Sequence, residues 1–291
     1  MTQILVNALL AASIYTLVGL GFGLAYQTMG FLNFAHGVFI TFAAYGLYLF
    51  KTVFNLSWPL SLPLAVACSI IFSLMFYFCI IQPLRQRGSS PLVILVASLG
   101  TYVVAQNTIS MIFGDRIQTV QTGPVIEGAM ILGARLTTMQ VYTLLATVIC
   151  FVVTYFILRF TKNGLLIRAY SANPTLAETA GISANKILLL ASVLSASLAG
   201  VAGIALAVDI GITPSMGMRP FMMGVVAVIV GGARNVVGIL LGALLLGLVQ
   251  NFGLVFCDSQ WQDAIAFIVL LLFLLVRPQG FFGKKIRKAE V

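Results

Sequence analysis

Few side chains in this 291-residue sequence could carry out acid–base or metal chemistry. The chain has one histidine, His36, seven acidic residues and four cysteines. General acid–base catalysis needs such groups within reach of one another, and metal sites need clustered Cys, His or carboxylate ligands. The sequence contains neither pattern, and it lacks the Gly-x-x-x-x-Gly-Lys-Ser/Thr motif that holds nucleotide phosphates. We therefore expect a protein that is not an enzyme, with no catalytic residue, no metal site and no cofactor of its own.

Charged residues are concentrated in one internal segment, 159–186, which lies between two long apolar runs. This segment has four Lys or Arg residues in a chain that is only 8% charged and has a mean hydropathy of +1.09. A chain that is 60% hydrophobic cannot bury its apolar residues in one soluble core, so most of it must face lipid. The segment is therefore expected to be a cytoplasmic loop that meets water and a soluble partner.

A short helix is predicted inside this loop. Asn173 can cap free N–H groups, Pro174 suits the first helical position, and Gly181 favours the end of a helix. Three residues would give the helix a small apolar face: Leu176, Ala177 and Ala180. Such a face fits insertion into a groove of another protein and also fits packing on the chain's own domain, and the residues alone leave both interpretations open.

The formal net charge of +9 favours membrane topology over nucleic-acid binding. The basic residues lie beside apolar runs, as expected when Lys and Arg stay in cytoplasmic loops. They form no basic face of a soluble domain, so no nucleic-acid partner is expected. The cysteines lie in or next to apolar runs and are expected to be packing residues.

The apolar runs predict one all-α, multi-pass membrane domain over residues 1–291. Several runs are shorter than the roughly 20 residues of a full span, which favours eight to ten crossings, some of them short or broken. The runs cover residues 4–26, 36–50, 60–82, 90–113, 139–158, 187–207, 221–232, 236–255 and 264–276.

The distribution of Lys and Arg predicts the orientation in the membrane. If 83–89, 159–186 and the basic tail 277–291 lie on one side, that side holds eleven Lys or Arg and the opposite loops hold four. This places the C-terminus in the cytoplasm and, with nine runs, the N-terminus outside.

Three motifs, in this order, carry a resemblance to LivH-type permeases of the branched-chain amino acid family of ABC importers, and the similarity covers nearly the whole chain. They are Asn33-Phe34-Ala35-His36-Gly37 after a glycine-rich first helix, Gly164-x3-Arg168-Ala169-x3-Asn173-Pro174-x-Leu176-Ala177-x3-Gly181-Ile182, and Arg277-Pro278-Gln279-Gly280-Phe281-Phe282-Gly283. The middle motif is similar to the family's coupling loop. The resemblance implies a type II-like importer permease in the bacterial inner membrane.

The resemblance also implies partners. These are a second, LivM-like permease subunit, two cytoplasmic ATPases that bind ATP and Mg²⁺, and a periplasmic binding protein that delivers the substrate; whether the permeases pair as a heterodimer or a homodimer stays open. The residues implied in ATPase coupling are Arg168, Asn173, Pro174, Leu176, Ala177, Glu178 and Gly181.

A second group of residues is a candidate for the translocation path or its gate. Each member has a competing structural interpretation, either a hydrogen bond inside a turn or close helix packing. The group is Asn33, Phe34, His36, Gly37, Gly231, Gly232 and Arg234. Arg234 departs from the resembled family, which tends to have a small neutral residue at that turn.

Four charged residues are expected at the outer interface, either as solvated loop charges or as contacts with the binding protein. They are Asp209, Arg219, Asp258 and Asp263.

Branched-chain amino acids are the leading substrate, followed by other amino acids or by urea and short amides. An ion-coupled secondary transporter is the main alternative of another class, but such carriers need buried ionisable groups and no acid lies inside an apolar run.

Overall fold

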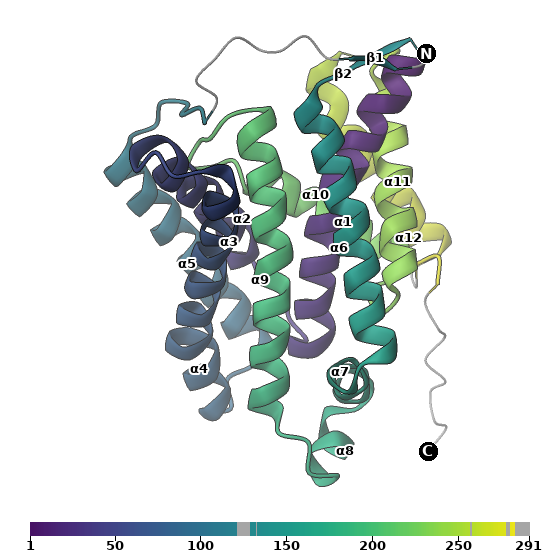
Figure 1. The fold of residues 1–291 in the computed structure, drawn as a ribbon. Helices are drawn as coiled ribbons and strands as arrows, with labels where there is room; N and C mark the ends of the chain where they lie inside the picture. Colours follow the sequence, from purple (N-terminus) through teal and green to yellow (C-terminus); the bar gives the residue numbers. More distant parts are fainter. Residues whose placement is uncertain (121–128, 132, 257, 278–279, 283–291) are drawn as a thin grey trace.

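Nine apolar helices form a bundle in the part of the chain that the structure, a computed structural model, describes: residues 1–120, 129–131, 133–256, 258–277 and 280–282 (Figure 1). The helices are Thr2–Met29 (α1), Ala35–Tyr48 (α2), Trp58–Phe76 (α3), Pro91–Phe113 (α5), Thr138–Phe160 (α6), Ala184–Asp209 (α9), Met218–Gly231 (α10), Val236–Gly253 (α11) and Gln262–Val276 (α12). Each of the nine predicted runs corresponds to one of them within a few residues, which confirms the all-α, multi-pass fold.

Seven helical segments of the described chain are long and apolar enough to cross a membrane. They include Trp58–Gln86, where α3 continues through a π-helical turn, Tyr77–Ile81 (η2), into Gln82–Gln86 (α4), and Ser259–Val276, where a 3₁₀ turn, Ser259–Trp261 (η3), precedes α12. The helix α10 has 14 residues, about 21 Å of rise, against about 30 Å for the hydrocarbon core. The helix α2 also has 14 residues and ends in a π-helical turn, Leu49–Val53 (η1). The expected short and broken spans are therefore these two helices.

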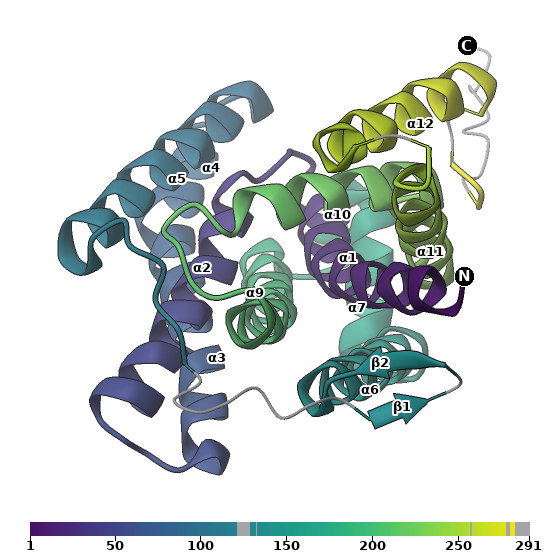
Figure 2. The same ribbon diagram turned by 90° about the horizontal axis from the view of Figure 1, so that it is seen from above.

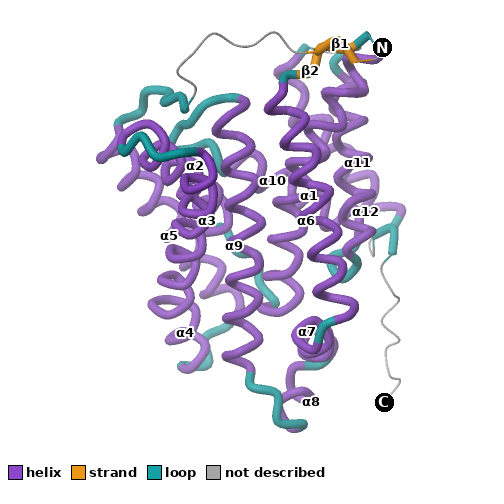
Figure 3. The backbone as a smooth tube through the Cα atoms, viewed as in Figure 1, coloured by secondary structure: helices purple, strands orange, loops and turns teal. Residues whose placement is uncertain are grey.

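The two ends of the bundle carry different elements (Figures 1 and 3). Two short helices, Lys162–Ala172 (α7) and Pro174–Thr179 (α8), form one end. The N-terminus and an antiparallel hairpin of Ala129–Ile131 (β1) and Ala134–Leu136 (β2) lie at the other, in register through Met130 and Arg135. The hairpin lies between the predicted runs 90–113 and 139–158; residues 121–128, which include Glu127, lie outside the described part of the chain.

The core is built around α1 and α9, which lie in the middle of the bundle when it is seen along its axis (Figure 2). Small residues let the backbones approach closely, as in many membrane helix pairs. A Cβ at Gly203 of α9 would overlap the carbonyl oxygen of Ile40, and one at Gly247 of α11 would overlap that of Ala8. In contrast, α6 and α12 bury few of their residues, as expected of helices that face lipid or a partner.

Candidate functional site

The short helix predicted in the charged segment is present as α8. The Asn173 Oδ1 atom accepts a hydrogen bond from the Leu176 backbone N–H at 3.0 Å, and Pro174 is the first helical residue. Gly181 has φ +84°, and the Ile182 N–H donates to the Ala177 carbonyl oxygen at 3.0 Å. Both ends of the helix are thus satisfied locally, and the sequence prediction of its caps is confirmed.

The residues that were expected to form one apolar face of α8 have different surroundings. The side chain of Leu176 is 66% exposed, whereas Ala177 is only 5% exposed and packs in the chain's own core. The Tyr170 hydroxyl donates to Glu178 Oε1 at 3.4 Å, which holds α8 against α7. The expectation of one shared face was therefore wrong, because Ala177 anchors the helix and Leu176 is the apolar group that remains available to a partner.

The helix α7 joins α8 rigidly to the membrane helix α6. The Thr161 hydroxyl caps α7 by accepting from the Gly164 N–H at 3.1 Å, and a Cβ at Gly164 would overlap the backbone of α6. Tyr170 is buried, and this burial raises the pKa of its hydroxyl, while the nearby Arg85 guanidinium opposes the shift. The phenol therefore stays neutral at physiological pH and can donate to Glu178. Arg168 is exposed, and its Nη2 donates to the Arg159 carbonyl oxygen at 3.4 Å.

Arg234 ties the turn between α10 and α11 to the end of α7. Its Nη2 donates to the carbonyl oxygen of Ser171 at 2.9 Å, and this carbonyl belongs to the last turn of α7. A guanidinium at a helix C-terminus is favourable both as a donor to free carbonyls and as a positive charge near the negative end of the helix dipole. Ser171 is buried in this joint.

The glycines near Arg234 form a close crossing of α10 and α11. A Cβ at Gly231 would overlap the carbonyl oxygen of Gly238, and one at Gly238 would overlap that of Gly231. Gly232 has φ +94° and ends α10. The Phe281 N–H donates to the Val230 carbonyl oxygen at 2.9 Å, so part of the third motif packs on this crossing. Pro278, Gln279, Gly283 and the rest of the basic tail lie outside the described residues.

The residues of the first motif lie in the core where α2 begins. Asn33 is buried, and its Oδ1 accepts from the Ala35 N–H at 3.1 Å. The backbone N–H of Phe34 donates to Ser98 Oγ on α5 at 3.0 Å, and the Phe34 ring packs edge-on against Phe221 of α10. These contacts fix the turn before α2 against two other helices.

His36 and Gly37 continue this packing. His36 is fully buried, and its Nδ1 lies 3.2 Å from Ser195 Oγ on α9. Its ring is also in edge contact with Phe22 and Phe39. A Cβ at Gly37 would come within 3.4 Å of the Gly217 carbonyl oxygen. In this conformation both residues serve packing, and their role in a path or gate stays a prediction.

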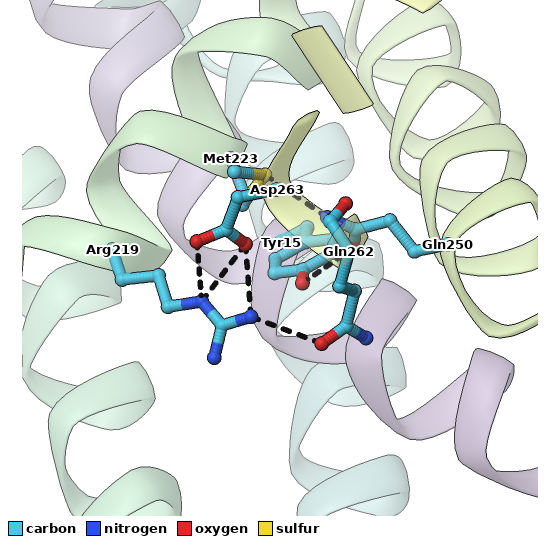
Figure 4. A network of polar contacts seen from close by, with 6 residues as sticks. All are labelled: Tyr15, Arg219, Met223, Gln250, Gln262 and Asp263. Carbon is cyan, nitrogen blue, oxygen red and sulfur yellow. Dashed lines mark hydrogen bonds and ion pairs between the residues drawn. The ribbon is translucent and has the colours of Figure 1, made fainter. Parts of the chain in front are cut away.

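Two of the four outer charged residues, Arg219 and Asp263, form an ion pair (Figure 4). The Nη2 and Nε atoms of Arg219 lie 2.8 and 2.9 Å from Asp263 Oδ1, and Nε also donates to Oδ2 at 3.0 Å. Nη2 donates in addition to Gln262 Oε1 at 2.9 Å. The first residues of α10 and α12 are therefore joined by four polar contacts of one guanidinium.

A buried polar network lies beside this ion pair (Figure 4). The Tyr15 hydroxyl donates to Gln250 Oε1 at 2.7 Å, and Gln250 Nε2 donates to the Gln262 carbonyl oxygen at 3.2 Å. Gln250 is fully buried, and its Nε2 also lies 3.3 Å from Met223 Sδ. This network fixes the start of α12, and with it Asp263, relative to α1, α10 and α11.

Several residues of these joints were not found from the sequence. Tyr170 and Ser171 lie inside the charged segment, but nothing in their spacing indicates their contacts. Ser98 and Ser195 lie in apolar runs, where a serine is common without a specific role. Their partners are 64 and 159 residues away in the chain, so only the tertiary structure identifies them.

Comparison with known proteins finds one family whose sequence model matches residues 4–274, described as the permease component of branched-chain amino acid transport systems. The chain is 31% identical to the high-affinity branched-chain amino acid transport system permease protein BraD of Pseudomonas aeruginosa, over 97% of this chain and 95% of the relative. It is 26% identical to LivH of Escherichia coli over the same shares, and 27% identical to a probable LivH of Methanocaldococcus jannaschii over 99% and 94%.

Among solved structures, the fold is similar to a chain of PsaBC from Streptococcus pneumoniae in complex with Fab. The TM-score is 0.53, with 95% of this chain and 92% of the other chain covered, at 13% sequence identity. At this identity the likeness concerns the fold alone. This arrangement of helices thus occurs in another protein of very different sequence.

Proposed function

The chain belongs to the family of permease components of branched-chain amino acid transport systems, and we propose that it is the membrane-spanning permease subunit of an ATP-driven ABC importer that forms half of the substrate's translocation path. The observation that carries this proposal is the family match over residues 4–274, which covers nearly all of the helices described above. The chain has no nucleotide-binding motif, so ATP and Mg²⁺ are bound by separate partner subunits.

The proposed assembly contains a second, LivM-like permease subunit, two cytoplasmic ATPases and a periplasmic binding protein. The ATPases dock on the end of the bundle that carries α7 and α8, with Leu176 inserted in a groove of the ATPase. The geometry supports this role because Ala177, Glu178 and the two caps hold α8 rigidly while Leu176 points away from the chain. The contact from Arg234 to Ser171 carries motion of α7 to the α10–α11 crossing, where Gly231 and Gly232 are the proposed moving parts.

We propose branched-chain amino acids as the substrates, since the relatives named above are permeases of branched-chain amino acid systems. Other amino acids, or urea and short amides, are the alternatives. The binding protein sets most of the selectivity in this scheme. The ligand of a periplasmic binding protein encoded beside this chain is therefore the observation that separates these substrates.

Copurification and reconstitution test the proposed function. The tagged chain, expressed with its neighbouring transport genes, is expected to bring down an ATPase and a second permease. In proteoliposomes with the binding protein, uptake of labelled leucine should require ATP and should be abolished by vanadate, which traps ABC ATPases. Uptake driven by a proton or sodium gradient, without ATP, would instead assign the chain to the secondary transporters.

We predict an inner-membrane orientation with the N-terminus outside and the C-terminus in the cytoplasm. The contacts gather Arg85, Arg168 and Arg234 with α7 and α8 at one end, and the N-terminus lies at the other end next to Arg135. A fluorescent reporter fused after Val291 should be bright, since it folds only in the cytoplasm, and an alkaline phosphatase fusion there should be inactive. An active phosphatase fusion after Val291 would contradict this orientation.

A further inference from the structure

A cavity of about 560 Å³ lies at the end of the bundle that carries the N-terminus, and it has both charged and apolar walls. Residues of α1, α6, α9, α10 and α12 line it, together with the loop between α9 and α10. A second hollow, of about 490 Å³, lies between α3, α6 and α9. The polar side-chain groups among its lining residues are the indole N–H of Trp58 and the hydroxyls of Tyr142 and Thr143. An apolar hollow suits lipid chains, whereas mixed walls suit a small amphiphile with charges at one end.

The positive charge in this cavity is Arg219, which other side chains hold in place. Asp263 and Gln262 engage its Nε and Nη2 atoms, and its Nη1 points away from both of them (Figure 4). Gln250 is fully buried and fixes the start of α12 through the Gln262 carbonyl, so the guanidinium is supported by a rigid network. An anion that meets Nη1 therefore finds a donor that is already oriented.

The negative charge is Asp209, the last residue of α9. Its Oδ1 accepts a hydrogen bond from Gln140 Nε2 at 3.2 Å, and Gln140 Oε1 in turn accepts from the Thr137 N–H at 3.1 Å in the N-terminal cap of α6. The loop that follows is fixed by two backbone hydrogen bonds between Ile212 and Gln118, of 2.8 and 3.0 Å. Asp209 is exposed and lines the cavity. Its Oδ2 atom can accept a hydrogen bond from a cationic group of a ligand.

The remaining walls are apolar. Leu10 and Ile14 of α1, Leu206 of α9 and Met216 of the loop line the same cavity. A guanidinium, a carboxylate and an aliphatic wall are the three groups that a zwitterionic amino acid with an apolar side chain requires. A zwitterion matches this set better than a simple anion or cation does. A simple anion would be repelled by Asp209, and a simple cation would be repelled by Arg219.

We propose that this cavity is an outer vestibule that binds the transported amino acid as a zwitterion, with its carboxylate on Arg219, its ammonium on Asp209 and its aliphatic side chain against α1. The inference rests on the proposed function and adds the substrate-recognising residues to it. The site is weak, because a path must release its ligand as readily as it takes it up. We expect a dissociation constant of about 1 mM, or roughly 4 kcal/mol of binding free energy. Such weak binding is compatible with a binding protein that sets the substrate choice.

Saturation-transfer NMR on the nucleotide-free importer, assembled with its partner permease and ATPases but without the binding protein, tests the proposal. Leucine, 4-methylpentanoate (leucine without its amine) and isopentylamine (leucine without its carboxylate) are the probes. Leucine is expected to bind best. Asp209→Asn keeps the acceptor for Gln140 and should weaken leucine by about tenfold, roughly the value of one charge-assisted hydrogen bond. It should not weaken 4-methylpentanoate, which has no ammonium to lose a partner and is no longer repelled by the Asp209 carboxylate.

The second variant is the double change Arg219→Gln with Asp263→Asn, which removes the guanidinium without leaving its carboxylate partner unpaired. It should weaken leucine by a similar factor and leave isopentylamine unchanged. Arg116→Gln is the matched control, because Arg116 is exposed on the same side and does not line the cavity. Thermal unfolding of each variant checks that the fold is intact.

Two results would overturn the inference. One is leucine binding that neither variant changes. The other is leucine binding that one variant weakens and the other strengthens, which would indicate a general electrostatic effect and not two direct contacts. The measurement needs no ATP. An importer that takes up leucine with ATP but shows no variant-sensitive binding would refute the vestibule alone, whereas absence of ATP-driven uptake would refute the proposed function.

Discussion

The change Leu176→Asp is expected to release the ATPases from a permease that is otherwise normally folded. Leu176 is 66% exposed on a capped helix, so the aspartate is solvated in the free subunit and costs little there. In the proposed complex the same carboxylate would be buried in an apolar groove without a partner, which costs about 3 kcal/mol or more. Association should weaken by at least about a hundredfold. Pull-down of the ATPase and ATP-driven uptake should both fall to background.

Matched variants separate docking from folding in this experiment. Leu176→Met keeps an apolar group of similar volume and should retain most of the association. Ser90→Asp adds the same charge at the exposed N-cap of α5, where aspartate is tolerated, and should behave like the unmodified chain. Ala177 is not a suitable target because it is buried against its own chain. If Leu176→Asp kept wild-type ATPase binding and uptake, α8 would be a surface helix with no docking role.

The change Gly231→Ala is expected to destabilise the bundle strongly. A Cβ at Gly231 would overlap the backbone carbonyl of Gly238 and come within 2.7 Å of the Ile239 nitrogen, and neither backbone atom can move without shifting α11. Overpacking of this kind costs about 1–3 kcal/mol, and more where backbone must move. We expect a markedly lower melting temperature of the purified subunit in detergent, measured by loss of the monodisperse peak on heating.

Gly100→Ala is the control for this prediction. Gly100 lies in the exposed part of α5, and a Cβ there would meet no atom within 4 Å. Alanine is the better helix former by about 0.5–1 kcal/mol, so this variant should melt at the same or a slightly higher temperature. A Gly231→Ala subunit as stable as the Gly100→Ala subunit would show that the α10–α11 crossing has room that the structure does not indicate.

The positions of the helices could be predicted from the sequence because they depend on local properties. An apolar run of sufficient length must become a helix in a membrane, since no water is present to satisfy its backbone. All nine runs were found in this way. The hairpin around Gly133 was not predicted. Gly133 has a φ of +79°, which permits a tight turn, and no hydrophobic pattern indicates this turn.

The ends of α8 were predictable for the same reason. An asparagine cap, a following proline and a glycine in the left-handed region act within a few residues, and all three are present at Asn173, Pro174 and Gly181. The surroundings of each face of α8 were not predictable. Leu176 and Ala177 are neighbours in the sequence, and only the packing of α7 decides that one is buried and the other exposed.

The sequence by itself therefore determined the nine apolar runs of a multi-pass membrane protein, the capped helix in a basic loop and the lack of a nucleotide-binding motif. The tertiary structure decided the pairs Arg234–Ser171, Arg219–Asp263 and Asp209–Gln140, whose partners are 63, 44 and 69 residues apart. Local propensity acts over one turn of a helix, whereas these contacts depend on which helices cross and at what distance. Small residues such as Gly231 and Gly203 set those distances, because they allow the backbones of neighbouring helices to touch.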